Sequence, residues 1–90
     1  MTTTYVVERK LPGLTLVQLQ QAATVAKDTC FEFSNNGQPV QYVGSTYYDD
    51  GALHCTFKAY SKEVVQQVNE KASLPFDKIA PAVRLDANNL

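Results

Sequence analysis

Residues Val40 to Tyr60, VQYVGSTYYDDGALHCTFKAY, decide the fold of this chain. The stretch consists of two runs rich in β-forming residues that meet at Asp50-Gly51. Asp-Gly between two such runs favours a tight two-residue turn, because that turn requires positive φ at its central positions. The sequence therefore predicts a β-hairpin that turns at Asp50 and Gly51.

A helical pattern precedes this hairpin. Thr15 followed by Gln18 is a capping-box pattern, which places the start of a helix at Leu16. Apolar residues then recur at intervals of three and four as far as Cys30, so that they form one stripe along the helix. The next residues, Phe31 to Pro39, contain an Asn-Asn-Gly cluster and are expected to form a loop.

A second helical pattern and two short β-type runs complete the chain. Ser61 is expected to cap the second helix, and Leu74-Pro75 to end it. The β-type runs are Thr4 to Arg9 and Ile79 to Asp86; Pro81 lacks an N–H, so the last strand is expected at a sheet edge. The order βαββαβ predicts an α+β, ferredoxin-like single domain over residues 1–90, with two helices on one face of a four-stranded antiparallel sheet.

The register of the hairpin predicts which residues face the helices. Counting outward from Asp50-Gly51 pairs Tyr47 with His54. The face toward the helices is then expected to contain Tyr42, Gly44, Thr46, Tyr48, Leu53, Cys55, Phe57 and Ala59. Nothing in one such domain covers the opposite face. We expect that face to form a homodimer contact, or a cavity beside it, through Val43, Tyr47, His54, Thr56 and Lys58.

Composition and charge exclude some partners. Eight basic and nine acidic residues give a net charge of −1, so no strong positive field attracts nucleic acid or an anionic membrane. No apolar run approaches the roughly 20 residues that cross a bilayer. The polar start MTTTY does not resemble a signal peptide, and we expect a cytoplasmic protein.

Candidate chemistry is sparse, because no P-loop, dinucleotide-binding, zincin or nucleophile-elbow motif is present. His54 is the only histidine, and a general base formed by His54 with Tyr47 or Glu8 is the catalytic hypothesis. A half-exposed polar residue on a strand is the simpler interpretation of His54. The residues themselves predict no cofactor.

Cys30 and Cys55 are the only cysteines. We expect two buried, reduced thiols, and a disulfide is the alternative. The candidates for metal ligands are His54, Cys55 and Cys30. They are weak candidates, because the sequence contains neither a C-x-x-C motif nor a cluster of cysteine and histidine.

The chain resembles a bacterial domain-of-unknown-function family of small proteins that includes a nickel-binding protein. The residues that carry the resemblance are Tyr5-Val6-Val7-Glu8-Arg9, Leu11-Pro12-Gly13-Leu14-Thr15, Cys30, Ser45-Thr46-Tyr47, Asp50-Gly51, Cys55, Ala59, Glu63 and Leu74-Pro75. The resemblance implies a ferredoxin-like fold, a homodimer and, in at least one relative, nickel binding.

The chain departs from that family at several positions. Many relatives carry tryptophan at the position of Tyr42, and histidine at the position of Gly44 or Val68. In the expected register both histidine positions lie toward the helices, so their loss removes ligands from one region. Ser73 replaces a glycine at a position that suits left-handed backbone.

Two functional hypotheses follow. The first is a small homodimeric binding protein for a small molecule or a metal ion, including a divergent nickel-binding protein. The alternative is a cofactor-free enzyme of the dimeric α+β barrel type that acts on a small hydrophobic substrate. An enclosed pocket containing His54 would favour the enzyme.

Overall fold

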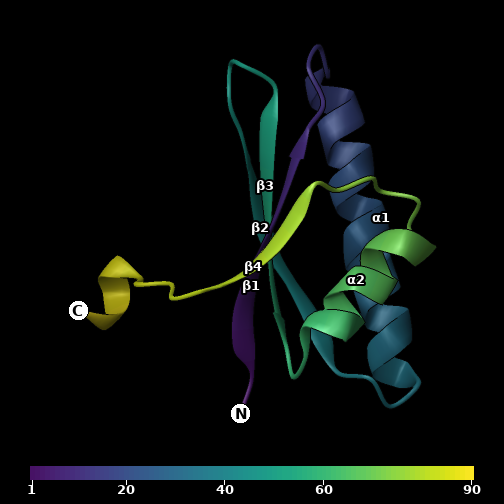
Figure 1. The fold of residues 1–90 in the computed structure, drawn as a ribbon, viewed down its shortest axis with the longest axis vertical. Coiled ribbons are helices and arrows are strands. Elements are labelled where there is room, and N and C mark those ends of the chain that lie inside the picture. The colour runs from purple at the N-terminus through teal and green to yellow at the C-terminus, as the bar shows by residue number, and fades with distance from the viewer.

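A computed structural model describes all 90 residues of the chain. The elements follow the predicted order βαββαβ, with a short 3-10 helix near the C-terminus (Figure 1). Their bounds are β1 Thr3–Lys10, α1 Leu16–Asn35, β2 Val40–Tyr47, β3 Ala52–Ala59, α2 Lys62–Lys71, β4 Lys78–Ala82 and η1 Ala87–Asn89.

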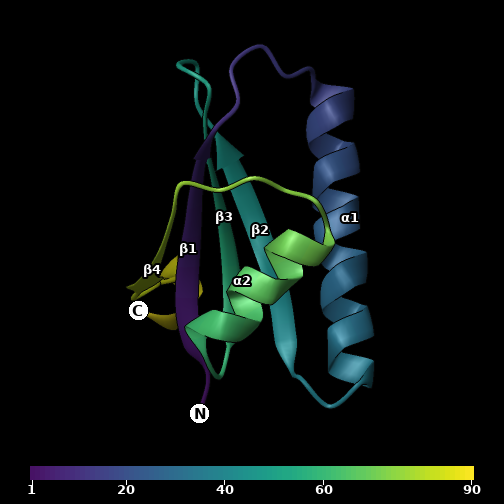
Figure 2. The same cartoon turned by 45° about the vertical axis from the view of Figure 1, so that its right-hand side comes forward.

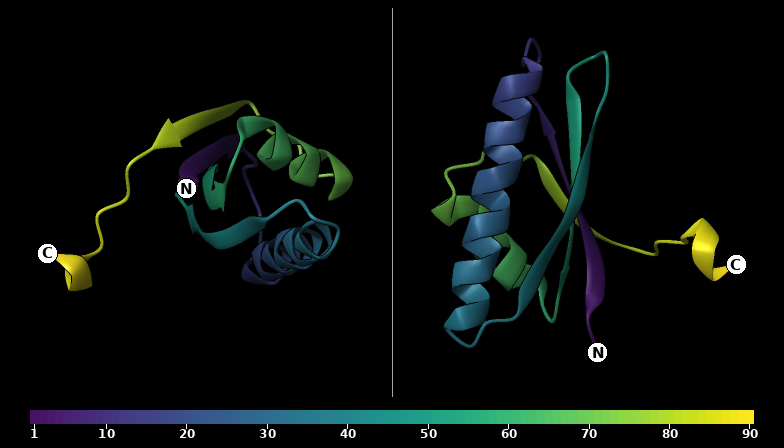
Figure 3. Two further views of the ribbon diagram at one scale, coloured as in Figure 1. Left: turned by 90° about the horizontal axis from the view of Figure 1, so that it is seen from below. Right: turned by 180° about the vertical axis from the view of Figure 1, so that it is seen from behind.

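The strands form one antiparallel sheet in the order β2-β3-β1-β4. Both helices lie on the same side of the sheet, and the chain after β4 leaves toward the other side (Figures 1 and 3). α1 lies alongside β2, whereas α2 packs over β3 and β4 (Figure 2). The ferredoxin-like α+β prediction is therefore confirmed.

The hairpin turn differs from the prediction. Tyr48 N donates to Ala52 O (2.8 Å) and Gly51 N donates to Tyr48 O (2.9 Å), so three residues, 49–51, form the loop. Gly51 has φ +90°, while Asp50 has no positive φ. This is a turn followed by one left-handed residue, and the expected two-residue turn, which needs two left-handed residues, is wrong.

The extra loop residue moves the register by one position. Tyr47 pairs with Leu53 and Ser45 with Cys55, and an irregularity between Tyr42 and Gly44 shifts the pairing again. Tyr47 and Ser45 thus face the helices, contrary to the prediction, because side-chain direction alternates along a strand. The predicted inward set on β3 is confirmed, since Leu53, Cys55, Phe57 and Ala59 are all buried.

α1 begins as predicted and ends later. Thr15 and Gln18 form both bonds of the capping box. The helix continues to Asn35, so most of the segment expected as a loop is helical. The Asn-Asn-Gly signal marks only the end of the helix, where Gly37 has φ +84°.

The C-terminal half also follows the prediction in part. Ser61 caps α2, which ends at Lys71, and Ser73 has φ 57° as its glycine-like position suggested. β4 comprises only Lys78–Ala82, which is shorter than the expected strand to Asp86. It lies at the sheet edge, as Pro81 predicted.

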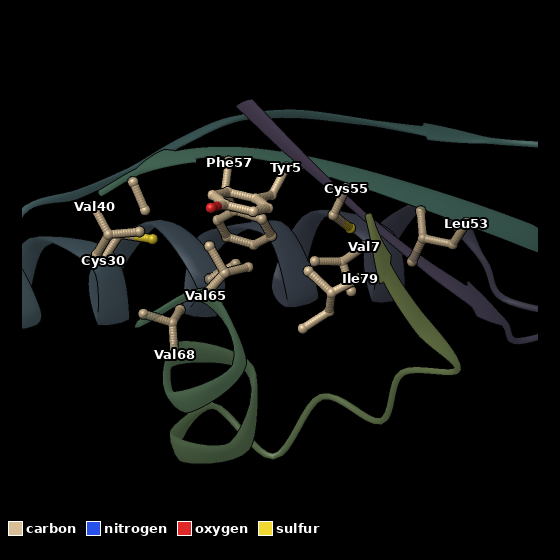
Figure 4. Close-up of a cluster of buried hydrophobic side chains, with 12 residues drawn as sticks. Tyr5, Val7, Cys30, Val40, Leu53, Cys55, Phe57, Val65, Val68 and Ile79 are labelled. Carbon is tan, nitrogen blue, oxygen red and sulfur yellow. The ribbon is translucent and has the colours of Figure 1, made fainter. Parts of the chain in front are cut away.

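The core lies between the sheet and the helices (Figure 4). Phe57 and Val7 from the sheet meet Val65 and Val68 from α2, and all four are fully buried. Cys30 and Cys55 are both buried and free, as expected, and they form no disulfide. No helix combines the length and apolar character needed to cross a bilayer.

Candidate functional site

A partly open cavity of about 260 Å³ lies between α1 and the sheet. Fourteen residues line it, and 11 of them are hydrophobic. α1 contributes Ala22, Ala23 and Ala26, whose short side chains leave space that longer residues would fill. An apolar concave site with a few polar groups is the usual form of a small-molecule pocket.

Arg9 supplies the only positive charge on the cavity wall. Arg9 is only 3% exposed, because side-chain direction alternates along β1 and directs Arg9 toward the helices with Tyr5 and Val7. Nη2 donates to Asn69 Oδ1 (2.7 Å) and Nη1 donates to Pro75 O (3.1 Å). The buried Nε has no hydrogen-bond partner.

A second polar group on the wall comes from β2 and β3. The hydroxyls of Tyr42 and Ser45 are hydrogen-bonded to each other, and Ser45 Oγ donates to Cys55 Sγ (3.0 Å). Burial raises the pKa of the Tyr42 phenol, and the Ser45 hydrogen bond and the Arg9 charge partly oppose that rise. Tyr42 is therefore a neutral hydrogen-bonding group at neutral pH.

Tyr47 also lines the cavity. Its hydroxyl donates to Leu11 O (2.7 Å) and accepts from Leu14 N (3.2 Å), which fastens β2 to the segment between β1 and α1. Tyr47 is thus a wall residue of the cavity. Its predicted place on the uncovered sheet face is wrong, because the three-residue loop reverses its direction.

His54 lies outside the cavity, on the uncovered face. Its Nε2 is 3.4 Å from Glu8 Oε1, and its ring contacts Tyr48 edge-on at 5.1 Å between ring centroids. Glu8 Oε2 is also 3.8 Å from Lys78 Nζ. His54 thus lies beside Glu8, whereas Tyr47 lies on the other face of the sheet.

Comparison with known proteins places the chain in a family. The model of a family described as "Nickel responsive protein SCO4226-like" matches residues 5–81. The chain belongs to this family. The crystal structure of SCO4226 from Streptomyces coelicolor A3(2) has a similar fold, with a TM-score of 0.73 and 24% sequence identity. The match covers 93% of this chain and 99% of that chain. No curated protein matches the chain.

The candidate metal ligands of this chain do not come together. Cys55 faces the helices and His54, one residue before it, faces the opposite side of the sheet. No group of three or more histidine, cysteine or acidic side chains is close enough to hold a metal ion. Within one chain, the residues therefore do not fit a nickel centre.

The positions of Gly44 and Val68 also differ from the expectation. Gly44 pairs with Thr56 on the uncovered face, while Val68 belongs to α2 and is fully buried against the sheet. The two positions lie on opposite sides of the sheet, so the expectation that they share one region is wrong. Histidines there would belong to two different sites.

Arg9 and its partner Asn69 were not among the candidate residues from sequence. The available signal was the alternation of side-chain direction along β1, which directs Arg9 to the same face of the sheet as Tyr5 and Val7. Asn69 gave no comparable signal, because its role depends on a residue 60 positions away.

Proposed function

We propose that this chain is a small homodimeric binding protein that holds a small apolar molecule in the cavity between α1 and the sheet. The cavity itself carries the proposal, since 11 of its 14 lining residues are hydrophobic. Apolar walls without close neighbours lose dispersion contacts, and a ligand restores them. The free thiols of Cys30 and Cys55 support a reducing, cytoplasmic location.

The homodimer is proposed from the uncovered face of the sheet. His54, Thr56 and Lys58 of the expected contact lie there half-buried, with Val6 of β1 beside Thr56. Val43 lies at the irregularity of β2, and Tyr47 no longer belongs to the set. Three apolar side chains after β4 are also strongly exposed: Val83, Leu85 and Leu90. A second copy of the chain would cover part of this apolar surface.

Sedimentation at micromolar concentration tests the dimer. Thr56→Arg places a charge at the centre of the proposed contact, and we expect it to produce a monomer. Thr24→Arg is the matched control, because Thr24 lies on the exposed side of α1. A folded native protein that sediments as a monomer would refute this part of the proposal.

Nickel binding is the second candidate, favoured by the family to which the chain belongs. A single chain offers His54 and Glu8 as one pair of donors, and a transition-metal site requires more. A nickel site would therefore need donors from a second copy. Elemental analysis after dialysis tests this candidate, with His54→Ala as the control variant expected to lose any retained metal.

The enzyme alternative required a pocket containing His54. His54 lies instead in a shallow hollow with Glu8, Asp77 and Lys78, and these four side chains are partly or fully exposed. Binding in the apolar cavity is the function that we favour over catalysis at His54.

Titration with 1-octanol, followed by NMR of the backbone amides, tests the cavity. We expect shifts at α1 and at the facing strands. Ala23→Phe inserts a phenyl ring into the cavity and is expected to abolish them. Val17→Phe adds the same ring on the exposed side of α1 and should leave binding unchanged. Equal binding by both variants would refute the proposed site.

A further inference from the structure

Arg9 is the only charged side chain that is buried in the whole domain. Its two hydrogen-bond acceptors, the Asn69 amide and the Pro75 carbonyl, are both neutral. None of the ion pairs of the protein includes Arg9. Its Nε is also the only buried side-chain nitrogen or oxygen without a partner. The guanidinium charge is thus neither compensated nor fully hydrogen-bonded.

An uncompensated buried cation is unfavourable, and arginine cannot relieve it by losing its proton. An anion within about 4–6 Å would relieve it. Arg9 lines the cavity, so a ligand in the cavity lies against the Arg9 side chain. Asn69 and Pro75 hold the guanidinium in place before any ligand arrives, which reduces the entropy lost on binding.

The remaining wall specifies the rest of the ligand. The three alanines of α1, together with Leu19 and Leu53, offer only apolar contacts. No second cation lines the cavity, so a doubly charged group would retain an unmatched charge there.

We propose that the cavity binds a small monocarboxylate with an apolar body, its carboxylate at Arg9 and its body along Ala22, Ala23 and Ala26. This inference rests on the proposed function, and it adds the chemical class of the ligand. A carboxylate suits the planar guanidinium, which pairs well with planar anions. The Tyr42 and Ser45 hydroxyls supply neutral hydrogen-bonding groups on the same wall.

Octanoate and 1-octanol test the charge requirement, because they share a chain of the same length and differ at the head group. Affinities are measured by calorimetry or NMR below the concentrations at which these compounds aggregate. We expect the native protein to bind octanoate at least about tenfold more tightly than 1-octanol, because hydrogen bonds to charged groups are the stronger ones.

Two variants remove the unmatched charge in different ways. Arg9→Met deletes the charge, and Asn69→Asp provides an internal carboxylate close to Arg9 Nη2 without a change of size. Both are expected to abolish the preference for octanoate over 1-octanol. Lys10→Met is the matched control, because Lys10 is an exposed neighbouring cation that does not line the cavity. It should retain the preference.

The outcomes separate this inference from the proposed function. Equal affinity of the native protein for both compounds, or a preference that persists in Asn69→Asp, would overturn the carboxylate assignment and leave the cavity as a binding site. Failure of both compounds to bind would overturn the proposed function itself. If Arg9→Met does not fold, Asn69→Asp decides the question.

Discussion

Replacement of Gly51 by alanine tests how the hairpin loop is seated against the segment after β1. Gly51 O accepts a hydrogen bond from Leu11 N (2.8 Å), and a Cβ at Gly51 would lie 2.6 Å from Pro12 Cα. Gly51 also has φ +90°, which side-chain-bearing residues rarely adopt. Alanine would therefore meet two obstacles at this position.

The two obstacles have separate magnitudes. Left-handed backbone costs an L-residue about 1–2 kcal/mol. Overpacking against backbone that cannot retreat costs a further amount of about 1–3 kcal/mol. We therefore expect Gly51→Ala to lower the free energy of unfolding by about 2–5 kcal/mol.

Gly37→Ala is the matched control. Gly37 has a similar φ of +84°, and a Cβ there would have no atom within 4 Å. We expect the control to cost only the backbone contribution of about 1–2 kcal/mol. Urea unfolding measures both variants, and an unchanged slope with denaturant establishes that stability alone has changed.

The difference between the variants isolates the contact with Pro12. For a domain of this size, each kcal/mol of difference between the two variants lowers the melting temperature of Gly51→Ala by about 4–8 °C relative to Gly37→Ala. If Gly51→Ala is no less stable than Gly37→Ala, the close seating of the loop on Pro12 is wrong.

Three further substitutions test other parts of the structure. Tyr47→Phe removes two hydrogen bonds, including the one to Leu11 O, and should lower the free energy of unfolding by about 1–3 kcal/mol, as measured by urea unfolding. Tyr48→Phe is the control, because Tyr48 is exposed and its replacement should change the free energy of unfolding little. Burial raises the pKa of the Cys30 thiol from 9.0 to about 12, so its contribution to stability is present below pH 9.0 and is lost as the pH rises from there toward about 12. Cys30→Ala should flatten that part of the stability profile, and an equally steep loss in the variant would contradict this assignment. Ser73→Gly should raise the melting temperature, because glycine adopts the φ of 57° at that position more easily by about 1 kcal/mol, and a lower melting temperature would contradict the strain inferred there.

Local signals predicted the fold well. The capping box at Thr15 and Gln18 and the cap at Ser61 fixed where both helices begin. Alternation along β3 identified its buried face, since every second residue from Leu53 to Ala59 is buried. These signals succeed because each depends on residues that are close together in the sequence.

The register of β2 could not be obtained in the same way. Asp-Gly is compatible with a two-residue and with a three-residue loop, which differ in the φ of Asp50 and in the hydrogen-bond partner of Tyr48. One residue of difference reversed the direction of Tyr47 and moved it from the expected dimer contact into the cavity wall. The second shift, between Tyr42 and Gly44, left no signal in the sequence that we could identify.

The candidate site depended on contacts between distant segments. Arg9 meets Asn69 and Pro75 only after α2 has packed on the sheet. The cavity likewise results from where α1 lies, which three alanines permit but do not specify. Sequence reasoning could assign Arg9 to a face, but it could not show that its charge has no counterion.

The uneven burial of α1 has a consequence for exchange with solvent. All of its buried residues, Ala26, Thr29 and Cys30, lie in the second half, while Leu16 and Val17 at its start are largely exposed. Elements with few buried contacts open locally at low free-energy cost. We therefore expect the amide hydrogens of the first turns of α1 to exchange with solvent faster than those of its second half.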